Sequence, residues 1–127
     1  MIDLALKSLH FLMECVKDFA IFMLDLEGRV FDWNIGAKKI LGYTQAEIIG
    51  HPFSTFFTAE EEQAGVPAQE LKRAAEVGRS DDNRWHVRKD GTHFFANGVT
   101  TALRDESGGL RGYAKVLRDN YEREDYP

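Results

Sequence analysis

The histidines are the first side chains to consider, because imidazole binds metals and exchanges protons near neutral pH. The chain contains His10, His51, His86 and His93, and no two of them have the spacing of a metal-binding helix. His86 and His93 flank a predicted hairpin turn at residues 90–91. A two-residue turn places both side chains on one sheet face, whereas a three-residue loop with a glycine bulge places them on opposite faces. Further metal ligands are not evident, so these histidines are expected to pack or to face solvent.

Cys15 and Lys115 are the other reactive side chains that stand out. Cys15 lies in a predicted surface helix without a nucleophile signature, and a single cysteine forms no intramolecular disulfide. Lys115 interrupts an apolar strand, where its ammonium either reaches water along the sheet or points into a cavity to meet an anionic ligand. No phosphate-binding loop or serine-hydrolase elbow occurs. The residues alone therefore favour a non-catalytic domain over a small enzyme.

Composition limits the function classes further. The chain of 127 residues is 43% apolar and carries a net charge of −5, which suits one globular domain. A weakly acidic surface without a basic run gives no electrostatic reason to bind nucleic acid or an anionic membrane. No apolar stretch approaches the roughly 20 residues of a membrane span, and no signal peptide is evident. We therefore expect a cytoplasmic protein without direct membrane insertion.

The order of predicted elements indicates an α+β fold. Strands and helices are segregated along the chain, which favours an antiparallel sheet over repeated βαβ units. The predicted elements are strands at 19–24 and 29–33, helices at 34–40, 44–50 and 67–77, and strands at 83–88, 92–104 and 110–118.

Helix boundaries in the middle of the chain are marked by capping residues. Asn34 is a candidate N-cap, and Gly42 a candidate stop for the same helix. Residues 44–47 match the capping box, in which a threonine and a glutamate satisfy the first free amides of a helix reciprocally. Residues 58–61 match it again and are expected to lead into the longer helix.

Residues 1–17 form a separate N-terminal unit, predicted to be an amphipathic helix. Its apolar stripe consists of Leu6, Leu9, Met13 and Val16. A stripe of this width serves equally to dock the helix on its own domain or to form a dimer interface. Residues 18–121 would then be the globular domain, and residues 122–127 a linker or tail.

Several segments together resemble a bacterial PAS domain of the sensory-box type. The resemblance covers roughly residues 18–121 and rests on segments 20–25, 28–34, 41–50, 88–91, 102–105 and 112–119. It implies a PAS fold, with a five-stranded antiparallel sheet in the order 2-1-5-4-3 and short helices on one face. It also implies a signal-transduction module of a two-component sensor, acting as a homodimer before an output domain such as a histidine kinase or cyclase.

The same resemblance argues against two cofactors. The flavin-binding subclass has a reactive cysteine where this chain has Phe53, and flavin-holding amides where it has His86, Ala96 and Leu117. The haem-binding subclass uses a histidine on the long helix, and residues 60–77 contain none. Cysteinyl-flavin and histidine-ligated haem are therefore not expected, and the resemblance names no other cofactor.

Two functions remain open from the sequence. One is a sensory module that binds a small molecule in its cavity or relays a signal through rearrangement of a dimer. The other is a ligand-free scaffold, with its core filled by its own large side chains, that acts only in dimerisation or protein interaction. The candidate cavity-lining residues are Trp33, Ile40, Ile48, Phe53, Phe56, His86, Phe94, Ala96 and Leu117.

Two further expectations follow from the resemblance. Residues Trp85, Val87, Phe95 and Val99 would cover the opposite sheet face. Asp119 would connect the last strand to the output linker, although Tyr121 replaces the threonine that is its usual partner.

Overall fold

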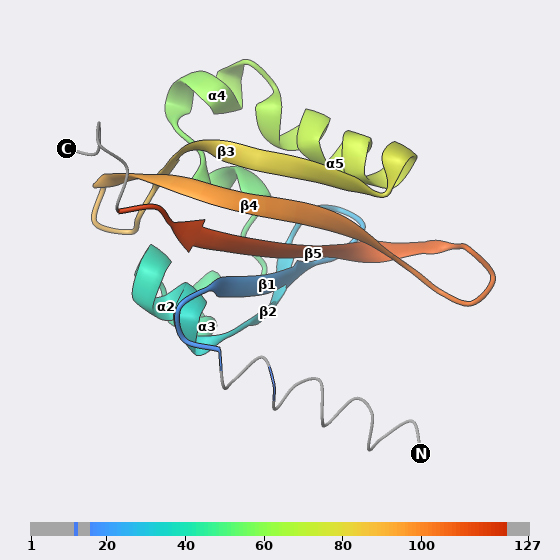
Figure 1. The fold of residues 1–127 in the computed structure, drawn as a ribbon, viewed down its shortest axis with the longest axis horizontal. Coiled ribbons are helices and arrows are strands. Elements are labelled where there is room, and N and C mark those ends of the chain that lie inside the picture. The colour runs from blue at the N-terminus through green and yellow to red at the C-terminus, as the bar shows by residue number, and fades with distance from the viewer. Residues whose placement is uncertain (1–11, 13–15, 122–127) are drawn as a thin grey trace.

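The computed structural model describes residue 12 and residues 16–121, and within them it forms one antiparallel sheet covered by short helices (Figure 1). The strand order is β2-β1-β5-β4-β3, so the predicted fold and strand order are confirmed. The strands are β1 (Ala20–Leu24), β2 (Val30–Trp33), β3 (Arg79–Val87), β4 (His93–Arg104) and β5 (Leu110–Asp119). The helices are α2 (Ile35–Leu41), α3 (Gln45–Ile48), the 3-10 helix η1 (Phe53–Phe56), α4 (Ala59–Gln63) and α5 (Val66–Val77).

The core lies between the sheet and the helices. α2 packs on β1, while α5 packs on β3 and β4, so the two helices lie over different strands of the sheet (Figure 1). Inward-facing side chains alternate with outward-facing ones along β1 and the second half of β5, as a half-buried antiparallel sheet requires. The buried aromatic and aliphatic side chains form a single cluster.

Capping residues set the helix boundaries near the start of the domain. The side chain of Asn34 accepts a hydrogen bond from Ala37 N, and Gly42 ends α2 in the left-handed conformation at φ 91°. Thr44 and Glu47 form both bonds of the capping box of α3. These predicted caps are confirmed.

The second predicted capping box is wrong in part. Thr58 Oγ1 accepts from Glu61 N at 3.3 Å, but the Glu61 carboxylate binds Arg84 at 2.7 Å and does not return to the helix start. Thr58 therefore caps the short helix α4. Gly65, at φ 78°, separates α4 from the longer helix α5.

The β3–β4 hairpin settles the position of the two flanking histidines. Arg88 N donates to Thr92 O, which closes a three-residue loop with Gly91 at φ 86°. His86 pairs with Phe94 and Val87 with His93, so the two histidines occupy opposite faces. His86 is fully buried beneath the helices, while His93 is exposed.

β3 begins at Arg79 rather than at the predicted Asn83. Residues 80–83 have low strand propensity, but pairing with β4 extends through them, and Ser80 and Asp82 face the core. Tertiary pairing outweighs local propensity here.

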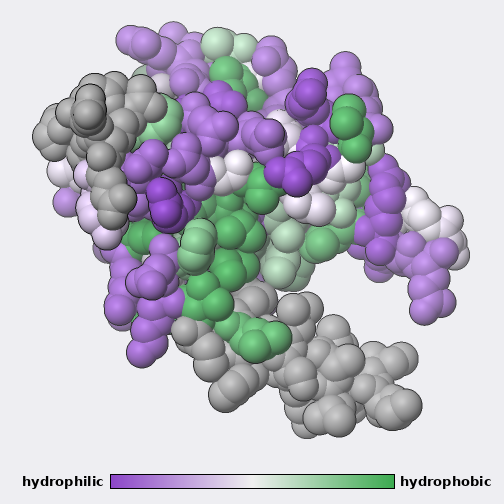
Figure 2. All heavy atoms as spheres, viewed as in Figure 1, coloured by the Kyte–Doolittle hydropathy of each residue, from purple (hydrophilic) through white to green (hydrophobic). Residues whose placement is uncertain are grey.

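The outer face of the sheet is apolar over much of its area. Figure 2 shows an apolar band across β1, β5 and β4, bordered by polar surface. Trp85 and Phe95 lie opposite each other with their rings 5.4 Å apart, and Val99 lies opposite Val116. Trp85, Val87 and Val99 are half-buried, and Phe95 is nearly buried, on the face opposite His86.

Most of the predicted N-terminal helix, with Leu6, Leu9 and Met13, lies outside the described residues, as do residues 122–127. Leu12 is helical and 59% exposed. Val16 is half-buried and, like Lys17, is not helical, so the predicted helix does not continue to residue 17.

Gly36 allows α2 to lie directly against the segment that leads into β1. A Cβ atom at this position would be 1.9 Å from Phe19 O and 3.1 Å from Lys17 O. Neither carbonyl is the end of a flexible side chain, so only glycine fits without moving the backbone. The φ angle of Gly36 is not positive, and the requirement is therefore one of space.

This contact predicts the sign of a stability change. Alanine for glycine inside a helix normally stabilises by about 0.5–1 kcal/mol, but Gly36→Ala should destabilise by about 2 kcal/mol because of the clash. The measurement is urea unfolding. Lys39→Ala, exposed on the same helix, is the control and should change stability by less than about 0.5 kcal/mol. A more stable Gly36→Ala protein would show that the close contact is absent.

Candidate functional site

The nine predicted cavity-lining residues lie together beneath the helices. Eight of them are at most 3% exposed, and Ile40 packs against the same cluster. They come from β2, α2, α3, η1, β3, β4 and β5, which meet only in the folded chain. Their proximity alone does not make them the lining of a ligand cavity.

Aromatic rings occupy much of this interior. The ring of Phe22 lies 5.2 Å from the rings of both Trp33 and Phe56, and Phe53 lies 4.8 Å from Phe57. Trp33 and Phe56 stack at 5.6 Å. The indole of Trp33 also donates to a backbone carbonyl at 2.9 Å, which fixes its orientation. These side chains therefore pack closely against one another.

A second group of core residues is charged, and we call it the buried ionic cluster: Glu70, Asp82, Arg84, His86 and Lys115. Lys115 Nζ donates to Glu70 Oε2 at 2.8 Å and to Asp82 Oδ2. The side chains of all three are at most 2% exposed. Lys115 thus points inward, and the anions that it meets are side chains of the same chain.

The cluster joins the helical layer to the sheet. Glu70 belongs to α5, and its Oε2 also accepts from Thr100 of β4 at 2.9 Å. Arg84 of β3 donates to Asp82 and, at 2.7 Å, to Glu61 of α4. α4, α5, β3, β4 and β5 therefore all contribute to one hydrogen-bonded network.

Asp82 lies at the centre of this network. Burial acts to raise its pKa, but the hydrogen bond from His86 and the charge of Lys115 outweigh burial, so the pKa of Asp82 lies well below its ordinary value of 3.8. Asp82 is therefore ionised. Sequence reasoning identified Lys115 and His86 but missed Glu70 and Asp82, the carboxylates to which they are hydrogen-bonded.

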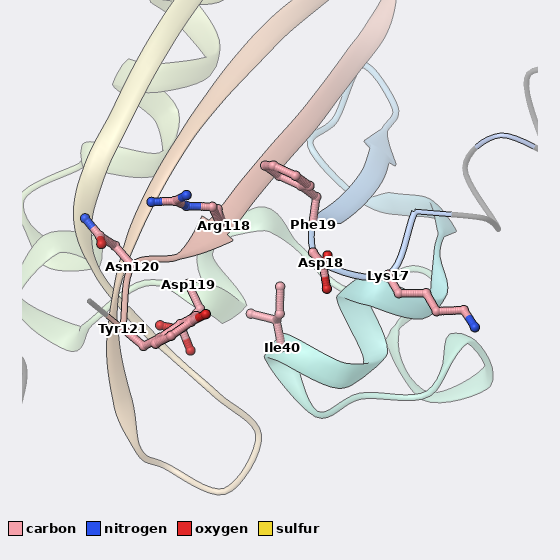
Figure 3. Close-up of a pocket in the computed structure, with 8 residues that line it drawn as sticks. All are labelled: Lys17, Asp18, Phe19, Ile40, Arg118, Asp119, Asn120 and Tyr121. Carbon is pink, nitrogen blue, oxygen red and sulfur yellow. The ribbon is translucent and has the colours of Figure 1, made fainter. Parts of the chain in front are cut away.

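A surface cleft of about 480 Å³ lies beside α2 (Figure 3). One side is formed by residues 17–19, which we call the incoming segment, and the other by residues 118–121, the outgoing segment. Ile40, near the end of α2, lies between them (Figure 3).

Arg88 connects this cleft to the core. Its guanidinium donates to Asp119 Oδ2 at 2.8 Å and to Ile40 O at 2.7 Å, and lies 4.3 Å from the centre of the Phe94 ring. The predicted linker residue Asp119 is thus held to the end of α2 by one side chain. Tyr121 is exposed in the described structure.

Within the part of the chain that the structure describes, no group of three histidine, cysteine or acidic residues is arranged to hold a metal ion. No helix there has the length and apolar character needed to cross a bilayer.

Removing the central cation of the cluster should be costly. Lys115→Met keeps most of the unbranched side chain but leaves Glu70 and Asp82 without their shared ammonium, so we expect a loss of about 3–5 kcal/mol in unfolding free energy. The matched control is Lys89→Met, which removes an exposed ion pair with Glu47 and should cost at most about 1 kcal/mol.

A double substitution distinguishes charge loss from packing loss. Adding Asp82→Asn to Lys115→Met should recover part of the stability, because it removes a buried anion that has lost a cation. Purely additive losses in urea unfolding would contradict electrostatic coupling between the two residues.

Comparisons with known proteins agree with this architecture. A family model described as PAS domain matches residues 18–122. Two-component system protein A of Emericella nidulans is 40% identical over 119 residues, which are 94% of this chain and 17% of that protein. The chain thus spans about a sixth of the length of this curated relative.

Two solved structures show the same fold. The PAS domain of a Colwellia psychrerythraea protein has a TM-score of 0.84 and 24% identity, with 94% of this chain and 99% of that chain covered. A domain of a sensory box sensor histidine kinase/response regulator from Geobacter sulfurreducens has a TM-score of 0.77 and 21% identity, with 94% and 97% covered. Given the family match, the strand order and the two-component relative, the chain belongs to the PAS domain family and is a signalling module.

Proposed function

We propose that this PAS domain relays a conformational signal within a longer, cytoplasmic two-component protein, without binding a ligand in its core. The observation that carries the proposal is that α2 holds the incoming segment at one end and the outgoing segment at the other. The domain itself is non-catalytic in this role.

The incoming segment is attached at the start of α2. Asn34 Nδ2 donates to Val16 O at 3.0 Å and to Phe19 O at 3.2 Å. Asn34 Oδ1 accepts from Ile21 N at 2.9 Å and from Ala37 N at 2.8 Å. One amide side chain therefore connects the segment before β1, β1 itself and the first turn of α2.

The outgoing segment is attached at the end of α2. Asp119 is held by Arg88, which also donates to Ile40 O in the last turn of the helix. A shift of α2 relative to the sheet would therefore change both attachments. An element that can occupy two positions, each favoured by a different state of the protein, allows one site to bias another.

The packed interior supports the ligand-free alternative over the small-molecule sensor. The predicted lining residues contact one another, and the polar groups among and beside them bind each other. The relative named above adds support for a two-component protein in which other domains supply kinase or output activity. A homodimer formed through the N-terminal helix remains part of the proposal.

Coupling between the two attachments can be measured in this chain. Asp119→Asn should weaken the Arg88 contact and shift the NMR signals of the Asn34 side-chain amide at the far end of α2. The matched control is Asp105→Asn, whose carboxylate accepts only local amide bonds in the β4–β5 turn among the contacts described. Shift changes confined to residues 88 and 118–121 would contradict relay through α2.

The ligand-free core has its own test. Native mass spectrometry of the purified protein should give the polypeptide mass, 14.5 kDa per chain, or its dimer, with nothing lost on denaturation. An added mass that disappears on denaturation would establish a bound small molecule and restore the sensor hypothesis for the nine lining residues.

A further inference from the structure

The end of α2 and the loop of the β3–β4 hairpin are held against each other. Lys89 N donates to Leu41 O at 2.9 Å, and Arg88 Nη1 donates to Ile40 O at 2.7 Å. Gly42 permits this approach, because a Cβ atom there would lie 3.3 Å from the Cβ of Lys89 on a backbone with φ 91°. Residues 40 and 88, which are 48 positions apart in the sequence, therefore lie side by side.

A cleft of about 440 Å³ opens at this junction, and we call it the basic cleft. Its volume is in the range of about 300–1,000 Å³ that is usual for small-molecule sites. Half of its lining residues are cationic, although the net charge of the chain is −5. The sequence contains no long basic run here, because the fold brings together two short basic pairs, 38–39 and 88–89. The lining residues are Lys39, Ile40, Gly42, Arg88, Lys89 and Asp90.

One of the three cations has no anionic partner among the contacts that the structure describes. This is Lys39, which is exposed. The carboxylate in the lining, Asp90, accepts from Thr92 N at 3.0 Å and from Thr92 Oγ1 at 2.7 Å, which holds it within the hairpin loop. The carbonyls of Ile40 and Leu41 accept hydrogen bonds from that loop, so the negative end of α2 repels an anion less strongly.

The other two cations are paired, but water reaches both pairs. Lys89 binds Glu47, and the two side chains are 50% and 38% exposed. Arg88 binds Asp119 at 2.8 Å, and these side chains are 24% and 20% exposed. Ion pairs that are open to water are weak. An anion with more charge than one carboxylate can therefore displace the intrachain partners.

We propose that the basic cleft binds a phosphate group, free or as a small organic monoester, and that the bound phosphate replaces Asp119 as the partner of Arg88. A phosphate monoester carries a charge of about −1.5 to −2 at pH 7, more than a carboxylate does. Its oxygens match the N–H fork of a guanidinium, while Lys39 and Lys89 add positive charge without a fixed geometry.

The exchange releases the outgoing segment from the end of α2. Asp119 lines the cleft between the incoming and outgoing segments, and Arg88 lines the basic cleft (Figure 3). Ile40 lines both clefts, so the ion pair crosses from one to the other beside the last turn of α2. Phosphate binding is then an input to the relay, a consequence that rests on the proposed function, whereas the binding site does not.

The test is an NMR titration of the unmodified chain with phenyl phosphate and, separately, with inorganic phosphate, each against sodium chloride at matched ionic strength. The side-chain signals of Arg88 and the backbone amides of Lys89 and Asp119 should shift and saturate in the low millimolar range. Tighter binding of phenyl phosphate assigns an organic monoester, and equal binding assigns the free ion. Shifts that do not saturate, or that chloride reproduces, overturn the proposal.

Two neighbouring lysines test the location of the site. Lys39→Gln should weaken the binding of phenyl phosphate by about fivefold, as expected for loss of one exposed charged contact. The matched control is Lys38→Gln, at an exposed position outside the cleft lining, which should change the affinity by less than about twofold. Equal losses in the two variants would mean a general effect of charge and would overturn the site.

The exchange at Arg88 has a test with a defined sign. Asp119→Asn removes the competing carboxylate, so phenyl phosphate should bind about fivefold more tightly. The control Asp105→Asn removes the same charge from the β4–β5 turn and should leave the affinity within about twofold. Weaker binding to Asp119→Asn would show that Asp119 orients Arg88 for the ligand, and the exchange would be wrong. These affinities are measured separately from the Asn34 signals that test the relay, so failure of the relay leaves the binding site standing.

Discussion

The ion pairs of Lys115 in the core are the interaction on which the rest of the structure most depends. An ammonium group removed from water must find anionic partners, and both of its partners come from distant parts of the chain. Glu70 lies on a helix and Asp82 on a strand two positions away in the sheet. Satisfying one charge therefore fixes the position of α5 on the sheet and the alignment of β3 with β5 at the same time. An apolar residue at position 115 could pack in many arrangements of α5 and β3. An ammonium that must reach two carboxylates is compatible with few of them.

The helical layer is thus held by two kinds of interaction. Near β1 and β2 the contacts are aromatic and non-directional, with rings packed at 4.8–6.4 Å. Near β3 and β4 they are charged and directional. Non-directional packing tolerates small displacements, and hydrogen-bonded charges do not. α2 is the exception on the aromatic side, because the hydrogen bonds of Asn34 tie its first turn to β1.

Local signals predicted much of this fold. The caps at Asn34 and Thr44 act within three residues, so their effect is visible in the sequence without any tertiary contact. Thr58 had the same local signature, but Arg84 is 23 positions away from Glu61 and its charge diverted the glutamate. The start of β3 was missed for a similar reason, because Asp81 and Asp82 are poor strand residues and long-range pairing with β4 extends the strand through them. The candidate core residues followed from the family pattern, yet nothing in the sequence near Lys115 indicated which carboxylates it would meet. Local sequence patterns carry no information about which charged residues meet across long distances in the chain.

The close packing of Gly36 against Phe19 O has a mechanical meaning beyond stability. A steric contact resists being pushed together but offers no resistance to separation. The hydrogen bonds of Asn34 to the same segment behave in the opposite way, since they resist separation. Together the two contacts hold the incoming segment against α2 under both compression and tension. A force that pushes or pulls on that segment is therefore transferred directly to α2.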